Sequence, residues 1–246
     1  NIDWTLGTLP SGVETNTPLL DSILNQNSYD LFLKTGIEVL QRGDSSLNND
    51  RNEIIFIDDT VPDWQILADN VRPGIEVVLL SSSGNEFDEI AGYLKNRTNL
   101  DAIHLISHGQ DGALYLGNLI IDDSNLTSYS NDLDVIKNSL SPTGDFLLYG
   151  CDIAQDFSGV AFINSISLLT KSDVAASENA TGSSVLGGDW VLEKSTGTIE
   201  TTTPFKDEFL NKDLYLDLLR PVLSSSSIAL TAVATGTTYN LSLIHI

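Results

Sequence analysis

The chain has 246 residues, of which 41% are hydrophobic, so it is long enough to bury the core of one large domain with appendages. Its 34 acidic and 12 basic residues give a net charge of −22, which argues against nucleic acid and anionic membranes as partners. The single cysteine excludes an internal disulfide, and no apolar run reaches the about 18 residues of a membrane span. We therefore expect a well-hydrated protein that does not insert into a membrane.

Residues 1–52 are mostly polar and predict an N-terminal extension and linker. Within this segment, residues 31–40 carry apolar side chains at helical spacing and predict a short amphipathic helix, followed by a linker over 41–52. The chain begins with Asn1 and shows no signal peptide at its start, so we expect a fragment whose natural beginning is missing.

Residues 53–205 alternate between compact apolar runs and segments with helical spacing. This alternation, with short loops, predicts an α/β domain: a three-layer α/β/α sandwich around a mainly parallel sheet. The expected strands are 53–57, 75–80, the apolar parts of 102–109 and 145–152, and 173–177. The expected helices are 62–71, 85–97, 154–169 and a largely helical segment over 124–140. Two appended β-hairpins are expected, 114–116 with 119–121 and 189–193 with 197–201.

The pattern changes after Phe205, and residues 206–246 predict a linker into a β-rich module that the chain truncates. From Pro221 onward the composition is rich in Ser, Thr and β-branched residues. Residues 241–246 (LSLIHI) resemble a translated sequencing adaptor, so we exclude His245 from any site.

Two of the expected strands end in reactive residues. The run 102–109 (AIHLISHG) ends beside His108, and the run 145–152 (DFLLYGCD) ends beside Cys151. In open parallel sheets, ligands bind at the edge formed by the carboxyl ends of the strands. A lone cysteine brought against a histidine is a candidate nucleophile with its base, so we expect these two residues to form a catalytic pair.

Each of these residues also has a structural interpretation. A histidine at a strand end can simply bind a backbone carbonyl, and cysteines are usually small buried hydrophobic residues. A helix expected from about Ala154 would place its N-terminus near Cys151 and favour a reactive thiolate. An inward-pointing Asp152 would act in the opposite direction. Composition alone leaves both interpretations open.

Metal sites are not favoured by the sequence. His104 and His108 form an H-x-x-x-H spacing, which binds zinc when it lies on a helix. In a strand the two imidazoles are roughly 13 Å apart, too far to share an ion with bonds of about 2.1 Å. We therefore predict a core role for His104. The acidic pairs Asp58-Asp59 and Asp122-Asp123 are weak calcium signals, because neither belongs to a ligand loop. We expect neither a metal nor a cofactor.

The two reactive runs resemble the signature of the caspase-like cysteine peptidases, which include caspases, gingipains and legumains. That signature is an apolar block ending in His-Gly and a later one ending in Ala/Gly-Cys, here HLISHG and FLLYGC. Residues 53–205 also resemble the bacterial domain of unknown function 4347, through motifs such as IIFIDDTVPDW, LLYGCDIA, SDVAASENATG and GGDWVLE. That domain is usually seen near the N-terminus of very large secreted adhesin-like proteins.

The resemblance implies a caspase-like fold and a role for each matching residue. Cys151 would be the nucleophile, His108 the acid/base, and the backbone amides of Gly109 and Cys151 the oxyanion donors. Asp152 and Glu178 are candidate substrate-binding residues, and Glu178 would favour a basic residue beside the cleaved bond. A solvated surface glutamate is the alternative interpretation of Glu178.

The resemblance also implies partners and a location. The substrate would be a polypeptide, either another surface protein or the chain's own downstream part, which we expect to continue into β-sandwich repeats. The location would be extracellular or at the bacterial cell surface. The alternative is a module that keeps the fold without the activity and serves in anchoring or adhesion.

Overall fold

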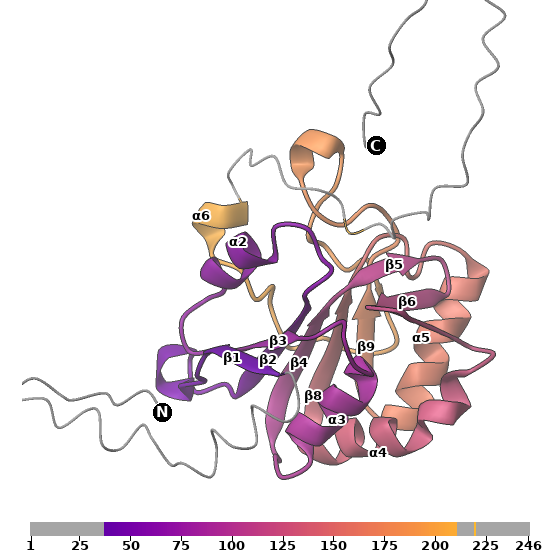
Figure 1. Ribbon diagram of the computed structural model, residues 1–246, viewed down its shortest axis with the longest axis horizontal. Coiled ribbons are helices and arrows are strands. Elements are labelled where there is room, and N and C mark those ends of the chain that lie inside the picture. The colour runs from indigo at the N-terminus through magenta and orange to yellow at the C-terminus, as the bar shows by residue number, and fades with distance from the viewer. Residues whose placement is uncertain (1–36, 211–218, 220–246) are drawn as a thin grey trace, which may run out of the picture.

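The computed structural model describes residues 37–210 and Leu219, and Figure 1 shows their arrangement. Most of the predicted helix at 31–40 and of the β-rich module at 206–246, including the adaptor-like residues 241–246, lies outside the described residues. The described part forms an α/β fold with a mainly parallel seven-stranded sheet and a small antiparallel sheet of three strands. Among the described residues, no helix is both long enough and apolar enough to cross a membrane.

The large sheet has the strand order β1-β3-β2-β4-β8-β9-β10. Its five central strands run parallel, whereas β1 and β10 pair antiparallel at the two edges. The strands are β1 (Glu38–Gln41), β2 (Glu53–Asp58), β3 (Glu76–Leu80), β4 (Leu100–Ile106), β8 (Leu140–Tyr149), β9 (Asp173–Ala176) and β10 (Lys194–Ser195). Every residue of β2 is buried, which explains why this strand reads as a continuous apolar run rather than an alternating one.

Helices flank the sheet, and one apolar cluster packs against each of its two faces. Because side chains alternate along a strand, Ile54 and Phe56 pack in one cluster and Ile55 and Ile57 in the other. The first cluster lies under α3 (Glu86–Leu94), α4 (Ser130–Ser139) and α5 (Phe157–Thr170). The second includes residues of the short helices α2 (Trp64–Asp69) and α6 (Asp207–Leu210). Figure 1 shows where these two helices lie. Short 3-10 helices are η1 (Ser45–Leu47), η2 (Leu126–Tyr129) and η3 (Ser184–Leu186).

The first expected hairpin is confirmed and is part of a larger unit. β6 (Ala113–Leu116) and β7 (Leu119–Asp122) pair antiparallel around a Gly-containing turn. The strand β5 (His108–Gln110) adds to β6 and completes the small sheet. The expected helical segment at 124–140 is also present, as η2 followed by α4.

Two local predictions are wrong, and tertiary contacts explain both. The described end of the predicted helix at 31–40 is instead β1, because the edge of β3 offers backbone partners that an isolated helix lacks. The expected hairpin of 189–193 with 197–201 is absent. Instead, β10 pairs with β9, and the Thr196 N–H donates to the Val174 carbonyl at 2.9 Å.

The central strand β4 provides a test of core packing. Ile103 is 0% exposed between β2 and β8, so truncation to alanine leaves a cavity under the helices. We expect Ile103→Ala to lower the free energy of unfolding by about 2–5 kcal/mol, measured by urea denaturation. Leu168→Ala is the matched control, because Leu168 is 67% exposed on α5. A control loss as large as that of Ile103→Ala would contradict the assignment of the core.

Candidate active site

The two reactive runs end side by side at one edge of the sheet. β4 and β8 are parallel neighbours, and their last paired residues are Ile106 and Tyr149. Beyond this pair, the Ser107 N–H still donates to the Tyr149 carbonyl at 3.0 Å. The chain then enters His108 on one side and Cys151 on the other, so parallel pairing brings together the loops that carry the predicted pair.

Two glycines allow these loops to touch through their backbones. A Cβ at Gly150 would lie 3.0 Å from the Ser107 oxygen and 3.1 Å from the Gly109 nitrogen. A Cβ at Gly109 would lie 2.9 Å from the Cys151 oxygen and 2.5 Å from Cγ1 of Ile153. The glycines that follow His108 and precede Cys151 are therefore required by close approach of one loop to the other.

The hydrogen bonding of His108 assigns its tautomer. The residue is 6% exposed, and its Nε2 lies 3.2 Å from the carbonyl oxygen of Thr60. A carbonyl only accepts, so Nε2 carries the proton in the neutral ring and Nδ1 carries the lone pair. Within the described part of the chain, Nδ1 is buried without a hydrogen-bond partner. The backbone of Thr60 thus orients the ring and leaves Nδ1 as the basic atom.

The sulfur of Cys151 is enclosed by the backbone of the loop that follows β9. The residue is 0% exposed, and the Thr181 N–H donates to Sγ at 3.3 Å. The thiol also donates to the Thr181 carbonyl oxygen at 3.5 Å, which favours the neutral thiol. The Thr181 N–H aimed at the sulfur instead favours the thiolate, the form of the residue that acts as a nucleophile.

The two predicted oxyanion donors converge on a single oxygen atom. The Gly109 N–H donates to the carbonyl of Leu219 at 3.2 Å, and the Cys151 N–H donates to the same carbonyl at 3.1 Å. The Leu219 N–H in turn donates to the Thr181 carbonyl at 2.9 Å. Two N–H groups aimed at one carbonyl oxygen are the arrangement that stabilises a tetrahedral oxyanion during acyl transfer.

The helix expected from about Ala154 begins later, at Phe157, so its N-terminus does not adjoin Cys151. The intervening turn is held by Asp111, which follows β5. Its Oδ1 accepts from the N–H groups of Asp156 at 2.8 Å and Gly159 at 3.0 Å, and its Oδ2 accepts from the hydroxyl of Ser158. Asp111 therefore caps α5 from the histidine-bearing loop and couples that loop to the segment after Cys151.

We expect Asp111→Ala to lower the free energy of unfolding by about 1–2 kcal/mol, because the first turn of α5 loses its acceptor. Urea denaturation measures the change. Asp111→Asn keeps one side-chain oxygen and should lose less, whereas Asp123→Ala removes an exposed carboxylate and should change little. Equal stability of the Asp111→Ala and Asp123→Ala chains would contradict the capping role.

The two candidate substrate-binding residues lie on adjacent loops. Asp152 adopts a left-handed backbone with φ of 61°, its N–H donates to the Asn179 carbonyl at 2.7 Å, and its Oδ1 accepts from Gln155 at 3.2 Å. Glu178 forms an ion pair with Lys194 on β10, with both side chains partly exposed. The carboxylate of Glu178 therefore already has a cationic partner from its own chain.

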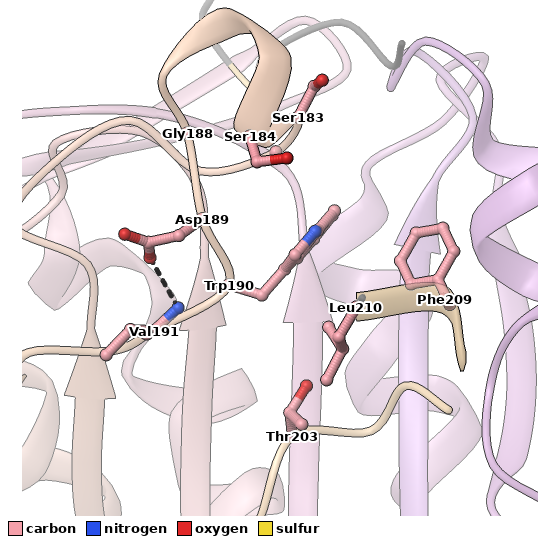
Figure 2. Close-up of a pocket in the computed structure, with 10 residues that line it drawn as sticks. Ser183, Ser184, Gly188, Asp189, Trp190, Val191, Thr203, Phe209 and Leu210 are labelled. Atoms are coloured by element: carbon pink, nitrogen blue, oxygen red, sulfur yellow. Dashed lines mark hydrogen bonds between the residues drawn. The ribbon is translucent and has the colours of Figure 1, made fainter. Parts of the chain in front are cut away.

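A cavity of about 290 Å³ lies beside these loops (Figure 2). Trp190 and Phe209 form its apolar wall, and both also pack with the cluster that contains Leu219. Asp189 lies at its margin and accepts a hydrogen bond from the Val191 N–H at 2.8 Å. The pocket is thus a mainly apolar extension of the region around Leu219.

The predicted core role of His104 is confirmed. Its Nε2 lies 3.2 Å from Oε2 of Glu53 on β2, and neither side chain is exposed to solvent. Burial lowers the pKa of His104. Burial opposes ionisation of Glu53, but hydrogen bonds from His104 and Arg51 and the charge of Arg72 lower its pKa to about 2. This buried network joins β2 and β4, and neither ring nitrogen of His104 bonds to His108 or Cys151 in the described part of the chain.

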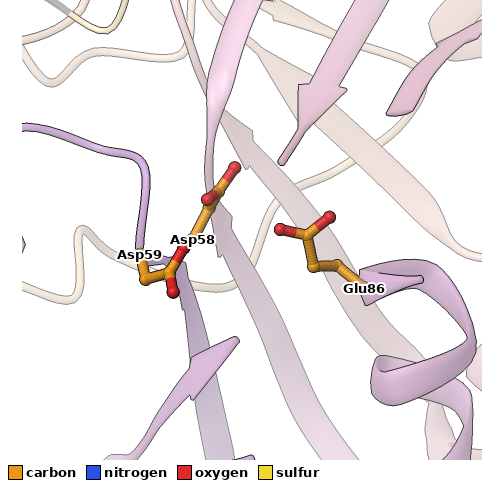
Figure 3. A group of neighbouring side chains, drawn as sticks. All are labelled: Asp58, Asp59 and Glu86. Atoms are coloured by element: carbon orange, nitrogen blue, oxygen red, sulfur yellow. The ribbon is translucent and has the colours of Figure 1, made fainter. Parts of the chain in front are cut away.

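Acidic side chains gather at a second place on the carboxyl edge of the sheet. Ligand atoms of Asp58, Asp59 and Glu86 lie within 4.8 Å of one another (Figure 3). Burial, followed by repulsion from the nearby carboxylates, raises the pKa of Glu86 to about 8. These oxygens have the chemistry that suits calcium, although no metal was expected from the sequence, and calorimetry with calcium tests whether an ion binds here. The other acidic pair serves a turn instead, since Asp122 accepts from the N–H of Ser124 at 2.8 Å.

The structure adds three residues that the sequence analysis did not single out. Thr60 orients His108, Thr181 contacts the sulfur of Cys151, and Leu219 occupies the two amides. Thr60 and Thr181 make these contacts through their backbones, so their side chains gave no signal in the sequence. Leu219 carries no chemical signal at all, because an apolar residue in the tail has no reactive group.

Taken together, these features define an α/β protein with a histidine and a cysteine at neighbouring strand ends. The family model described as Domain of unknown function (DUF4347) matches residues 54–214, well over half of the chain. The chain therefore belongs to this family. No curated protein matches the chain.

Proposed function

We propose that this domain is a caspase-like cysteine peptidase in which Cys151 is the nucleophile and His108 the acid/base. The observation that carries the proposal is the convergence of the Gly109 and Cys151 amides on one carbonyl oxygen, at 3.2 and 3.1 Å. A structural cysteine needs no such pair of donors beside it. Histidine Nδ1 oriented by a carbonyl on Nε2 supplies the second component of amide hydrolysis.

The contacts suggest a separate catalytic role for each of these groups. His108 takes the thiol proton and later donates it to the leaving amine. The two amides stabilise the oxyanion, and their fixed backbone geometry avoids reorganisation during the reaction. The Leu219 N–H donates to the Thr181 carbonyl at 2.9 Å, so a substrate residue bound at the same two amides would be recognised through its backbone.

Hydrolysis of fluorogenic peptides with leucine or arginine before the cleaved bond tests this function. Cys151→Ala should abolish turnover, and His108→Ala should reduce it by about 10²–10⁴-fold. The matched control is His104→Gln, measured below its unfolding temperature, because His104 binds Glu53 and not the reactive loops. An inert wild type whose Cys151 alkylation rate is indifferent to His108 would refute the proposal.

A non-catalytic module is the second candidate, and the complete burial of Cys151 favours it. In that case the domain would serve in anchoring or presenting a secreted surface protein, and Cys151→Ala would leave fold and phenotype unchanged. A polypeptide substrate and an extracellular or cell-surface location stay predictions of the family resemblance.

A further inference from the structure

We infer that the chain is its own substrate and that the peptidase cuts the bond between Leu219 and Arg220. This inference rests on the proposed function and names the substrate of the same site. It follows from the position of Leu219, whose backbone and side chain are both held by the residues around Cys151. The product would be a domain ending at Leu219, separated from everything that follows it.

The backbone of Leu219 is bound as a substrate residue would be. Its carbonyl is the carbonyl of the Leu219–Arg220 peptide bond, and it accepts from both Gly109 and Cys151. Its N–H donates to Thr181, whose own N–H contacts the sulfur of Cys151. Both backbone polar groups of Leu219 are therefore satisfied by the segments that surround Cys151 and by Cys151 itself. A tail packed merely for hydrophobic contact would need neither oxyanion donor.

The side chain of Leu219 determines which residue fits before the cleaved bond. It is 1% exposed and packs in the cluster that contains Ala180, Phe205 and Phe209. Such a site accepts a branched apolar side chain and rejects a charge, because a buried charge without a partner is strongly destabilised. Glu178 does not supply a partner, since it is paired with Lys194. We therefore expect the site to favour an apolar residue before the cleaved bond, and not the basic residue that an unpaired Glu178 would favour.

The reaction balances with water as the co-reactant. The thiol proton of Cys151 moves to Nδ1 of His108 as the sulfur bonds to the Leu219 carbonyl carbon, and the oxygen takes the electron pair. Collapse breaks the carbon–nitrogen bond, and the Arg220 nitrogen takes the proton from His108. Water then hydrolyses the thioester, which leaves a carboxylate on Leu219 and restores the thiol.

The test follows cleavage of the full chain by intact mass spectrometry. The protein is purified with Cys151 blocked as a mixed disulfide, and a reductant starts the reaction. We expect fragments of residues 1–219 and 220–246, formed at a rate independent of protein concentration, and no cleavage of Cys151→Ala. Leu219→Met should react within about 10-fold of wild type. Leu219→Lys should react at least about 100-fold more slowly, while still hydrolysing a separate leucyl peptide.

The outcomes distinguish this inference from the function on which it rests. An intact chain that hydrolyses leucyl peptides overturns self-cleavage and leaves the peptidase assignment standing. Cleavage by Cys151 at another bond, or faster cleavage of Leu219→Lys, also overturns it. Cleavage at Leu219 in Cys151→Ala would show that another protease is responsible. If neither the chain nor any peptide is cut after the thiol is restored, the proposed function itself fails.

Discussion

Replacing Gly109 with alanine is expected to reduce amide hydrolysis by about 10²–10³-fold while the domain stays folded. The new Cβ would lie 2.5 Å from Cγ1 of Ile153 and 2.9 Å from the carbonyl oxygen of Cys151, so β5 must move away from the cysteine loop. That shift separates the two amides that now converge on the Leu219 oxygen. The measurement is leucyl peptide hydrolysis in parallel with alkylation of Cys151, which needs no oxyanion donor.

Gly92 provides the matched control for this substitution. It lies within α3, and a Cβ there would meet nothing within 4 Å. Gly92→Ala should therefore keep full activity and raise the free energy of unfolding by up to about 1 kcal/mol, as expected for alanine in a helix. Wild-type hydrolysis by Gly109→Ala would exclude the oxyanion role of this loop.

Replacing Glu86 with glutamine is expected to stabilise the protein at pH 8 by roughly 3–5 kcal/mol, because the buried carboxylate no longer has to ionise. Glu86 is 0% exposed, and within the described residues neither of its carboxylate oxygens has a hydrogen-bond partner. Burial, together with the charges of Asp58, Glu89 and Asp59, raises its pKa from 4.5 to about 8. The folded state therefore holds a proton that the unfolded state has already released.

The direction of the pH effect follows from this difference in bound protons. Between pH 4.5 and about 8 the unfolded state binds fewer protons than the folded state at Glu86, so its contribution to stability decreases as pH rises. The measurement is urea denaturation of both chains from pH 4 to 9 in the presence of a chelator. The stability difference between them should be small at acid pH and grow across this window.

Glu38→Gln is the control for this experiment, because it removes an exposed carboxylate from β1. It should change stability by no more than about 0.5 kcal/mol at any pH. A Glu86→Gln chain less stable than wild type at pH 8 would show that the Glu86 carboxylate is satisfied as an anion. Repetition with calcium in place of the chelator extends the comparison, because an ion held by Glu86 would stabilise wild type alone.

The central sheet, and the shared edge at which the candidate residues His108 and Cys151 lie, could be predicted from the sequence. Strands buried on both faces leave continuous apolar runs, so β2, β4 and β8 could be located without coordinates. Parallel pairing then required His108 and Cys151 to lie at one edge. These features can be read from the sequence because burial restricts the residue types of the strand itself to apolar ones.

The edges of the sheet and the backbone contacts around His108 and Cys151 depend on the tertiary structure. β1 and β10 form because a neighbouring strand offers hydrogen bonds, and nothing in their own residues requires them. Thr60, Thr181 and Leu219 make their contacts through backbone atoms that every residue carries, so their residue types did not indicate these contacts in the sequence. Their contacts arise where loops distant in sequence meet, so the position of the Leu219 carbonyl between the Gly109 and Cys151 amides is seen only in three dimensions.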